Sequence, residues 1–311
     1  MSQPRKPQEY LQLTTPLLNW LEEDASWDRL PTLVKARIHW SSRIATLNAA
    51  ISHQLVDRES YAEHTTFSAP LFIVGPWRSG TTAMHDLLVA ATGGSAPQTW
   101  QCMNAASFMI TGRPKKSRTT KRPMDELVVT SESPQEDEFA ILTLGEASAY
   151  RALLMPHRIS SLKYTLDQEY WLREPSWLFS WTRFLGGVLQ SLDTSPQPLI
   201  LKSPGHTFRL KAILRHFPRS RIVWMVRDPT EVFESNQRMW RAMFEKYALT
   251  DWDEGELDEF LRNVLQQTAS TLRWCVSTIP ENQLKVVELR QLKENPSLAV
   301  DEVVRHFSLN A

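Results

Sequence analysis

The residues best suited to bind a ligand lie in the stretch from Gly75 to Thr82, which reads GPWRSGTT. A short apolar run, residues 71–74, precedes it, and a helix-type pattern follows it. The first N–H groups of a helix lack carbonyl partners, so together with the positive end of the helix dipole they form an anion site. Arg78 adds a fixed positive charge. Three hydroxyls add neutral donors: Ser79, Thr81 and Thr82. We therefore expect a phosphate-binding loop here, with a plain strand-turn-helix junction as the alternative.

The spacing of the glycines narrows the class of ligand. Gly75 and Gly80 have the separation found in nucleotide triphosphatase loops, but Thr81 stands where those loops carry a lysine. A triphosphatase needs that lysine on the β- and γ-phosphates. The substitution argues against ordinary ATP or GTP hydrolysis.

A second group of polar residues follows two later strand-type runs. The pattern from residue 198 to residue 236 is strand, loop, helix, strand, loop, helix, which is typical of a parallel sheet with ligands at the carboxyl ends of its strands. Lys202 ends the first run and His206 follows on a Pro-Gly turn. Arg227 ends the second run, and Ser235 lies eight residues later in the next helix.

These two groups together resemble the sulfotransferases that use 3′-phosphoadenosine 5′-phosphosulfate (PAPS). Residues 76–82 resemble the family's 5′-phosphosulfate loop, Pro-Lys/Arg-Ser-Gly-Thr-Thr, with Trp77 inserted. Arg227 and Ser235 resemble its 3′-phosphate site, and the resemblance spans about residues 70–240. It implies sulfuryl transfer without a metal, with adenosine 3′,5′-bisphosphate as the spent donor. The implied donor-binding residues are Arg78, Ser79, Gly80, Thr81, Thr82, Arg227 and Ser235.

The residues that would carry the chemistry follow from the same comparison. Arg78 and Lys202 would stabilise charge on the transferred group and the leaving phosphate. An imidazole can remove a proton near neutral pH, which makes His206 a candidate base, with a structural role as the alternative. Glu138 is a second candidate, in a Pro-x-Glu-Asp-Glu-Phe run that also resembles this subfamily. We read that run as a helix start capped by Ser133, where acids are favourable on dipole grounds alone.

Two departures from the family pattern weaken parts of this assignment. Gln101 stands where the subfamily commonly has a glutamate, and an amide cannot accept a proton at neutral pH. The Arg-Lys-Gly-type loop that closes over the 3′-phosphate is missing, so Arg238, Arg241 or the basic run 113–122 would have to replace it. That run holds six basic residues in ten and is read as an exposed loop, or alternatively as a lid over an anion. The region 145–195, rich in Trp and Tyr, is read either as an acceptor-binding wall or as plain core.

The elements that must position these residues indicate an α/β fold. We expect a three-layer α/β/α domain of the P-loop nucleotide-binding type, with a central parallel sheet of about five strands. The expected strands are near residues 70–75, 97–101, 198–202, 221–226 and 284–288. We expect one domain over residues 1–311, with residues 1–65 as a helical portion packing on it. Within that portion, residues 8–23 and 31–55 show the apolar period of packing helices.

Composition limits the remaining function classes. The chain has 311 residues and a formal net charge of zero, so nothing global points to nucleic acid or a membrane surface as a partner. Its two cysteines have no metal-ligand spacing and make no disulfide framework, and no apolar run is long enough to span a bilayer. We expect a cytoplasmic enzyme that moves a sulfuryl group from PAPS to a hydroxyl or amine of a small hydrophobic acceptor. The alternatives are a P-loop small-molecule kinase and a non-catalytic nucleotide-binding protein.

Overall fold

A computed structural model describes residues 13–55, 69–125, 127–191 and 198–309 of the chain. Four parallel strands form its central sheet, in the order β4-β1-β5-β6. Their bounds are β1 (Leu71–Val74), β4 (Ile200–Lys202), β5 (Arg221–Val226) and β6 (Leu284–Glu288). In the register, Phe72 of β1 pairs with Leu201 on one side and with Ile222 on the other.

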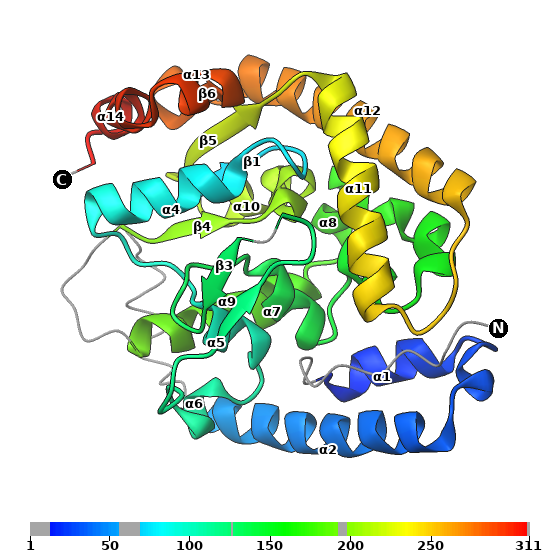
Figure 1. Cartoon of the computed structure of the whole chain (residues 1–311). Coiled ribbons are helices and arrows are strands. Elements are labelled where there is room, and N and C mark those ends of the chain that lie inside the picture. Colours follow the sequence, from blue (N-terminus) through cyan, green and yellow to red (C-terminus); the bar gives the residue numbers. More distant parts are fainter. Residues whose placement is uncertain (1–12, 56–68, 126, 192–197, 310–311) are drawn as a thin grey trace.

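Helices cover both faces of this sheet (Figure 1). Leu71 and Ile73 of β1 join a buried cluster with one group of helices: α4 (Thr81–Thr92), α13 (Leu289–Glu294) and α14 (Pro296–Phe307). Phe72 and Val74 point to the opposite face, where they pack with α9 (Ser176–Gln190), α10 (Leu210–His216) and α12 (Glu254–Thr278). Strands β1, β4 and β5 are mostly apolar because both their faces are buried, whereas β6, at the edge of the sheet, is partly exposed and contains Lys285 and Glu288. The three-layer α/β/α fold with a parallel sheet is confirmed.

The expected strand at residues 97–101 is wrong. The chain forms helix α5 (Thr99–Met103) there, and only an isolated antiparallel bridge joins Gln98 to Pro134. The buried Gln101 explains the difference, since its side-chain oxygen accepts the N–H of Gln98 at 2.7 Å and closes a capping box. The sheet therefore has four strands rather than about five.

A small hairpin lies over the sheet edge where β1 and β4 end. It consists of β2 (Thr119–Lys121) and β3 (Val128–Thr130), and α7 (Glu138–Thr143) follows it. The prediction that Ser133 caps a helix containing three acids is wrong, because α7 begins only at Glu138 and the Ser133 hydroxyl instead accepts the N–H of Thr130. The remaining helices are α6 (Phe108–Thr111), α8 (Gln168–Arg173), α11 (Pro229–Tyr247) and the 3₁₀ segments 27–29, 149–153, 156–166, 204–208 and 281–283.

The N-terminal helices α1 (Thr15–Glu22) and α2 (Thr32–Leu55) pack in different ways. Helix α1 buries Leu17, Leu18 and Leu21, as its apolar period predicts. Helix α2 runs along one edge of the molecule (Figure 1). Unlike α1, it turns most of its large apolar side chains to solvent. Six of its large apolar side chains are exposed. Ile38 is partly buried against the core cluster that contains α1, and the fully buried positions are Ser42, Ala45 and Ser52. The expectation that the apolar face of α2 packs on the domain is wrong. The single-domain organisation itself stays a prediction, and its residues 1–12 and 56–65 lie outside the described part.

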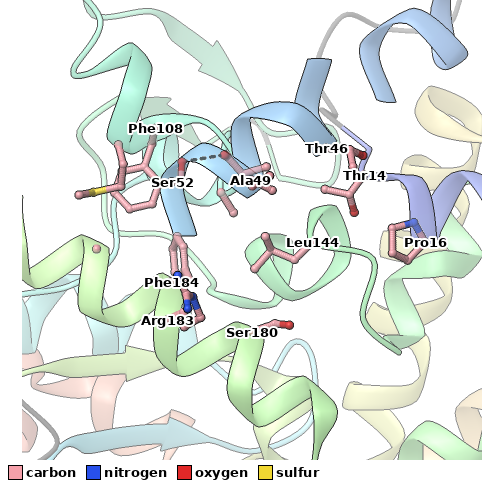
Figure 2. A pocket seen from close by; sticks show the side chains of 15 residues that line it. Thr14, Pro16, Thr46, Ala49, Ser52, Phe108, Leu144, Ser180, Arg183 and Phe184 are labelled. Atoms are coloured by element: carbon pink, nitrogen blue, oxygen red, sulfur yellow. Dashed lines mark hydrogen bonds between the residues drawn. The ribbon is translucent and has the colours of Figure 1, made fainter. Parts of the chain in front are cut away.

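Small residues leave a cavity of about 560 Å³ between α2 and α9 (Figure 2). Polar contacts hold α2 at this site: Ser52 Oγ donates to the Ala106 carbonyl at 3.1 Å and Asn48 donates to Ser107 Oγ at 3.0 Å. Across the described parts of the chain, no helix combines the length and apolar character that crossing a bilayer requires.

Candidate active site

The loop between β1 and α4 has the geometry expected of an anion-binding turn. Gly80 precedes the helix with φ at 94°, and Arg78 is also left-handed with φ at 70°. A left-handed non-glycine residue costs about 1 kcal/mol, and such strain gathers at functional sites. The amides of Gly80, Thr81 and Thr82 stand at the start of α4, where no preceding turn supplies carbonyl partners.

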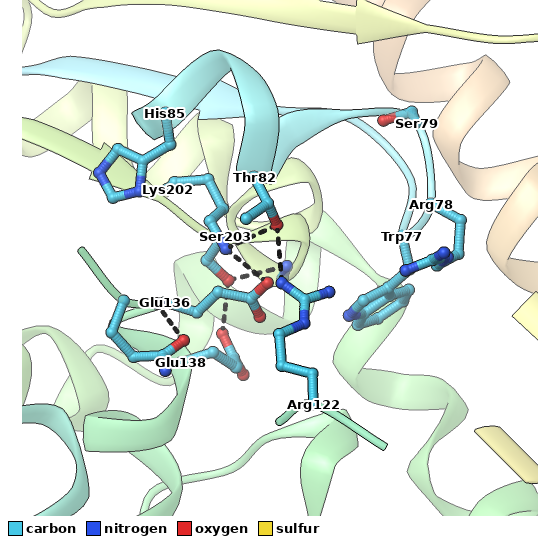
Figure 3. Close-up of polar contacts among 12 residues, drawn as sticks. Trp77, Arg78, Ser79, Thr82, His85, Arg122, Glu136, Glu138, Lys202 and Ser203 are labelled. Carbon is cyan, nitrogen blue, oxygen red and sulfur yellow. Dashed lines mark hydrogen bonds and ion pairs between the residues drawn. The ribbon is translucent and has the colours of Figure 1, made fainter. Parts of the chain in front are cut away.

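These residues border a cavity of about 670 Å³. Gly80, Thr81 and Thr82 line it, but Ser79 does not. The Ser79 side chain is fully buried and donates back to the Pro76 carbonyl at 2.8 Å, and Figure 3 shows it turned away from the polar group around Thr82. Its hydroxyl therefore shapes the turn and faces away from the cavity.

The two predicted anion-binding groups meet at Arg78. Arg78 Nε donates to Ser235 Oγ at 3.1 Å, and Arg227 Nη1 donates to the Arg78 carbonyl at 3.0 Å. Arg227 also pairs with Glu231 and lines the same cavity as Gly80. The structure thus brings together residues that lie about 150 positions apart in the sequence.

A second arginine joins this group from the hairpin. The Asp125 carboxylate lies 2.9 Å from Arg78 Nη1 and 2.9 Å from Arg122 Nη2. Arg122 Nη1 also lies 3.5 Å from Thr82 Oγ1. Residues of the basic run 113–122 therefore supply part of the cavity wall, while residues 113–121 are exposed, as the surface-loop interpretation expects. A role as a lid over an anion stays a prediction.

Lys202 does not line the cavity itself but, from just behind the wall, links the loop to a carboxylate that does (Figure 3). Its side chain is 2% exposed, and Nζ donates to Glu136 Oε1 at 2.7 Å and to Thr82 Oγ1 at 3.4 Å. Glu136 also accepts a hydrogen bond from the Tyr150 hydroxyl, which itself accepts from Trp77 Nε1. Burial, followed by the Glu136 charge, raises the pKa of Tyr150 well above its ordinary value, so this phenol stays a donor.

Neither predicted base lines the cavity. His206 is fully buried, with Nε2 2.8 Å from Asp137 Oδ2. Glu138 is equally buried and forms an ion pair with Arg209. Burial alone would raise the pKa of Glu138, but the Arg209 guanidinium outweighs burial and holds that pKa below its ordinary value.

The three acids of this run each take a different basic partner. Glu136 pairs with Lys202, Asp137 with His206 and Glu138 with Arg209, so only the first of them reaches the cavity. Sequence reasoning named the run but chose the wrong member as the one facing the site. It included Arg122 only as part of the basic run and gave no role to Lys293, and both line the cavity.

The other sequence candidates lie elsewhere. Gln101 is buried in its capping box and donates to Ser191 Oγ at 2.8 Å, away from the cavity lining. Arg241 pairs with Glu254, and neither Arg241 nor Arg238 lines the cavity. His85 lies in α4 behind Lys202 and contacts the Ile200 carbonyl at 3.3 Å (Figure 3). Burial, with a smaller contribution from the Lys202 charge, lowers the pKa of His85 to about 3.

The apolar part of the cavity comes mainly from α11 and the hairpin. Only Tyr150 and Leu153 of the aromatic region 145–195 line it, while that region's tryptophans are core. The large apolar and aromatic lining residues are Trp77, Trp100, Met103, Met124, Leu127, Val129, Phe139, Tyr150, Leu153, Met239, Trp240, Met243, Tyr247 and Leu289. The same cavity also has a polar and mainly basic part, which includes Arg78, Arg122, Arg227 and Lys293. An apolar wall beside convergent polar groups is typical of a small-molecule site.

Comparison with known proteins places this geometry in a family. Omega-hydroxy-beta-dihydromenaquinone-9 sulfotransferase Stf3 of Mycobacterium bovis and that of Mycobacterium tuberculosis are each 32% identical to this chain over 193 residues. The aligned stretch is 60% of this chain and 49% of each relative, so the chain spans about half the length of the curated relatives it matches.

Solved structures share the fold. Sulfotransferase STF1 from Mycobacterium tuberculosis H37Rv superposes with a TM-score of 0.69 at 17% identity, covering 95% of this chain and 81% of that one. Sulfotransferase STF9 from Mycobacterium avium gives 0.62 at 16% identity, covering 97% and 85%. Residues 70–311, which contain the loop, Lys202 and Arg227, match the profile described as Sulfotransferase family. This chain belongs to the sulfotransferase family.

Proposed function

We propose that this chain transfers a sulfuryl group from PAPS to the hydroxyl of a small hydrophobic acceptor. One observation carries the proposal: Lys202 Nζ lies within reach of both the anion loop, at Thr82, and the Glu136 carboxylate on the cavity wall. A cation, an anion cradle and a proton acceptor therefore converge where an in-line transfer would need them.

The donor site rests on groups that the fold has already assembled. The free amides of Gly80 to Thr82 suit the 5′-phosphosulfate, and Arg78 adds charge beside them. Arg227 and Ser235 suit the 3′-phosphate that distinguishes PAPS from other adenine nucleotides. Lys293, on the lining of the same cavity, is our candidate for the missing closing contact.

Glu136 is the better candidate for the general base. Its carboxylate would take the proton from the acceptor hydroxyl as that oxygen bonds to sulfur and the bond from sulfur to the bridging phosphate oxygen breaks. Lys202 and Arg78 would stabilise the charge that builds on the leaving phosphate. His206 and Glu138 do not reach the cavity, and we assign them the task of holding the segment that carries Glu136.

The acceptor class follows from the cavity wall. Aromatic and methionine side chains of α11, the hairpin and the loop line the same cavity as the Glu136 carboxylate. Such a wall favours an apolar alcohol over a sugar. The curated relatives, by their names, act on a hydroxylated dihydromenaquinone, which is in line with this choice. We propose the cytoplasm as the location, supported by the two buried, unpaired thiols Cys102 and Cys275.

Radiolabelled PAPS and a panel of hydrophobic alcohols test the proposal, with labelled sulfate ester as the readout. Arg227→Ala and Ser235→Ala should weaken binding of PAPS while changing adenosine phosphosulfate binding little, because only PAPS carries the 3′-phosphate. Equal losses for both nucleotides would refute the 3′-phosphate assignment.

Two other outcomes would favour the alternative functions. Mg²⁺-dependent ATP turnover on the same panel would favour the kinase alternative. Tight binding of adenosine 3′,5′-bisphosphate with no transfer to any acceptor would favour a non-catalytic binding protein.

A further inference from the structure

Helix α2 presents its large apolar side chains to solvent. They share one face of the helix, because they recur at steps of three, four or seven residues. Their exposed fractions are Leu33 66%, Trp40 68%, Ile44 41%, Leu47 62%, Ile51 43% and Leu55 47%. We call these six residues the α2 stripe. A helix of 24 residues is about 36 Å long, so the stripe follows a whole edge of the molecule (Figure 1). A continuous apolar surface of this kind marks an interaction site.

The charges on α2 are of one sign. The helix contains Lys35, Arg37 and Arg43 and no Asp or Glu. Arg37 and Arg43 are exposed and flank the stripe at helical spacing. Lys35 and His39 lie on the flank nearer α1, where Lys35 Nζ contacts the Asp28 carbonyl and His39 contacts Glu22. The outer face of α2 thus combines apolar side chains with arginines.

A second basic segment lies at the carboxyl end of α2. Helix α6 packs there through the hydrogen bond from Ser52 to Ala106 (Figure 2), and the chain leaves α6 directly into the basic run. In the first part of this run, residues 113–118, the exposed basic residues are Arg113, Lys115, Lys116 and Arg118. Glu132 contacts this segment, at 3.6 Å from Arg113 and through a hydrogen bond from Ser117, and offsets one of the four charges.

We propose that α2 lies in the surface of an anionic membrane, with the α2 stripe between the lipid headgroups and the acyl chains. Basic side chains beside a Trp- and Leu-bearing face are the combination that holds interfacial helices on such surfaces. Arg37 and Arg43 would extend to the lipid phosphates along their apolar stems, and residues 113–118 would add charge at one end. The negative surface supplies the partner charge that α2 lacks.

A second copy of this chain fits the same face less well. If two α2 helices packed together, the stripe would be covered, but the arginines of both copies would meet without an acid on either helix. Like charges across an interface oppose association. Charge complementarity therefore favours lipid over a dimer.

If α2 lies in the membrane surface, the candidate active site also lies near the lipid. This step of the inference rests on the proposed function. Pro114 and Arg118, from the segment at the end of α2, also line the candidate active site. Docking through α2 would bring that wall close to the lipid surface, where hydrophobic alcohols dissolve. The docking itself depends only on α2 and the basic segment.

The experiment is co-sedimentation of the full chain with vesicles of equal phosphatidylglycerol and phosphatidylcholine, compared with pure phosphatidylcholine. The parent should bind the anionic vesicles and lose binding as salt rises. Trp40→Ser/Leu47→Ser should abolish measurable binding. Arg37→Gln/Arg43→Gln should weaken it about 25-fold, at roughly fivefold per basic residue. Matched controls alter equally exposed positions elsewhere: Val276→Ser/Leu298→Ser for the apolar pair and Arg219→Gln/Arg273→Gln for the basic pair. Both should bind as the parent does.

Three results would overturn the proposal. One is failure of the parent to bind anionic vesicles, and another is equal loss in the control pairs. The third is a concentration-dependent dimer that Trp40→Ser/Leu47→Ser converts to a monomer while vesicle binding is absent, which would assign the face to a second copy. Sulfuryl transfer to a short water-soluble alcohol should be unaffected by Trp40→Ser/Leu47→Ser, so failure of docking and failure of the proposed function give different results.

Discussion

Glu136 differs from its two acidic neighbours because it lines the cavity and contacts a lysine and a tyrosine that can donate hydrogen bonds. Its side chain is 13% exposed and contacts Lys202 and Tyr150, whereas Asp137 and Glu138 are fully enclosed by structural partners. A carboxylate held by donors at the edge of an apolar chamber can receive a proton from a bound hydroxyl.

At the residue scale, we expect Glu136→Gln to lower kcat by about 10²- to 10⁴-fold, because the amide keeps the shape of the carboxylate but cannot take a proton. Binding of adenosine 3′,5′-bisphosphate, measured by calorimetry, should stay close to the parent's. Glu138→Gln is the matched control, and it should instead destabilise the fold by about 3–5 kcal/mol by leaving Arg209 unpaired. A well-folded Glu136→Gln enzyme with the parent's kcat would exclude Glu136 as the base.

The sequence could name the acidic run but not the member that faces the site. Side-chain direction depends on where the helix begins, and a cap at Ser133 would have placed all three acids in one turn. The helix begins at Glu138, so Glu136 lies outside it in irregular chain, and its side chain takes a different partner from that of Glu138. Single residues such as Lys202 and Arg227 were predictable because each directly follows an apolar strand.

At the element scale, the anion loop depends on close approach of β1 to β5. Gly75 has φ at 134°, and a Cβ there would lie 2.5 Å from the Met225 carbonyl oxygen, a backbone atom that cannot turn aside. The strand-to-loop junction therefore admits no side chain.

We expect Gly75→Ala to destabilise the fold by more than about 1 kcal/mol and to weaken donor binding, because the loop must shift to relieve the contact. Urea unfolding and nucleotide titration measure the two effects. Gly93→Ala is the control: its φ is also positive, at 62°, but an added Cβ meets nothing within 4 Å. It should cost about 1 kcal/mol and leave donor binding intact. If the two variants bound the donor equally well, the tight junction would have no role in shaping the site.

Elements buried on both sides were the most predictable. The strands at residues 71–74, 200–202, 221–226 and 284–288 follow from their apolar runs. The short helix at 99–103 was missed because a single side chain, Gln101, closes it. The apolar period of α2 predicted a helix correctly, but periodicity does not say whether the apolar face meets the core or the surroundings.

At the scale of the whole molecule, the parallel sheet gathers the site from distant parts of the chain. The carboxyl ends of β1, β4 and β5 meet at one edge and deliver the loop, Lys202 and Arg227. Sequence spacing alone could not show this assembly, since the pairing order of the strands sets it.

Burial of one histidine behind this edge should make folding stability depend on pH. The pKa of His85 falls to about 3 in the folded protein, whereas in the unfolded chain it lies near 6.5. The contribution of neutral His85 to the free energy of unfolding is complete above pH 6.5. It is lost as pH falls toward 3, because in that range only the unfolded state binds the proton. Between pH 7 and pH 5 the loss is about 2 kcal/mol. His85→Gln should reduce the fall in unfolding free energy over this range by that amount in urea titrations. An identical fall in parent and variant would contradict the assignment.

The pairing of Glu136, Asp137 and Glu138 with Lys202, His206 and Arg209 also constrains how this region can diverge. Three successive acidic residues each pair with a different basic residue of a second segment. Correct pairing therefore depends on the order of these residues as well as on their types. An insertion or deletion of one residue inside the acidic run would place the carboxylates opposite the wrong basic side chains and leave buried charges unpaired. We therefore expect insertions and deletions to be tolerated on either side of the acidic run but not inside it.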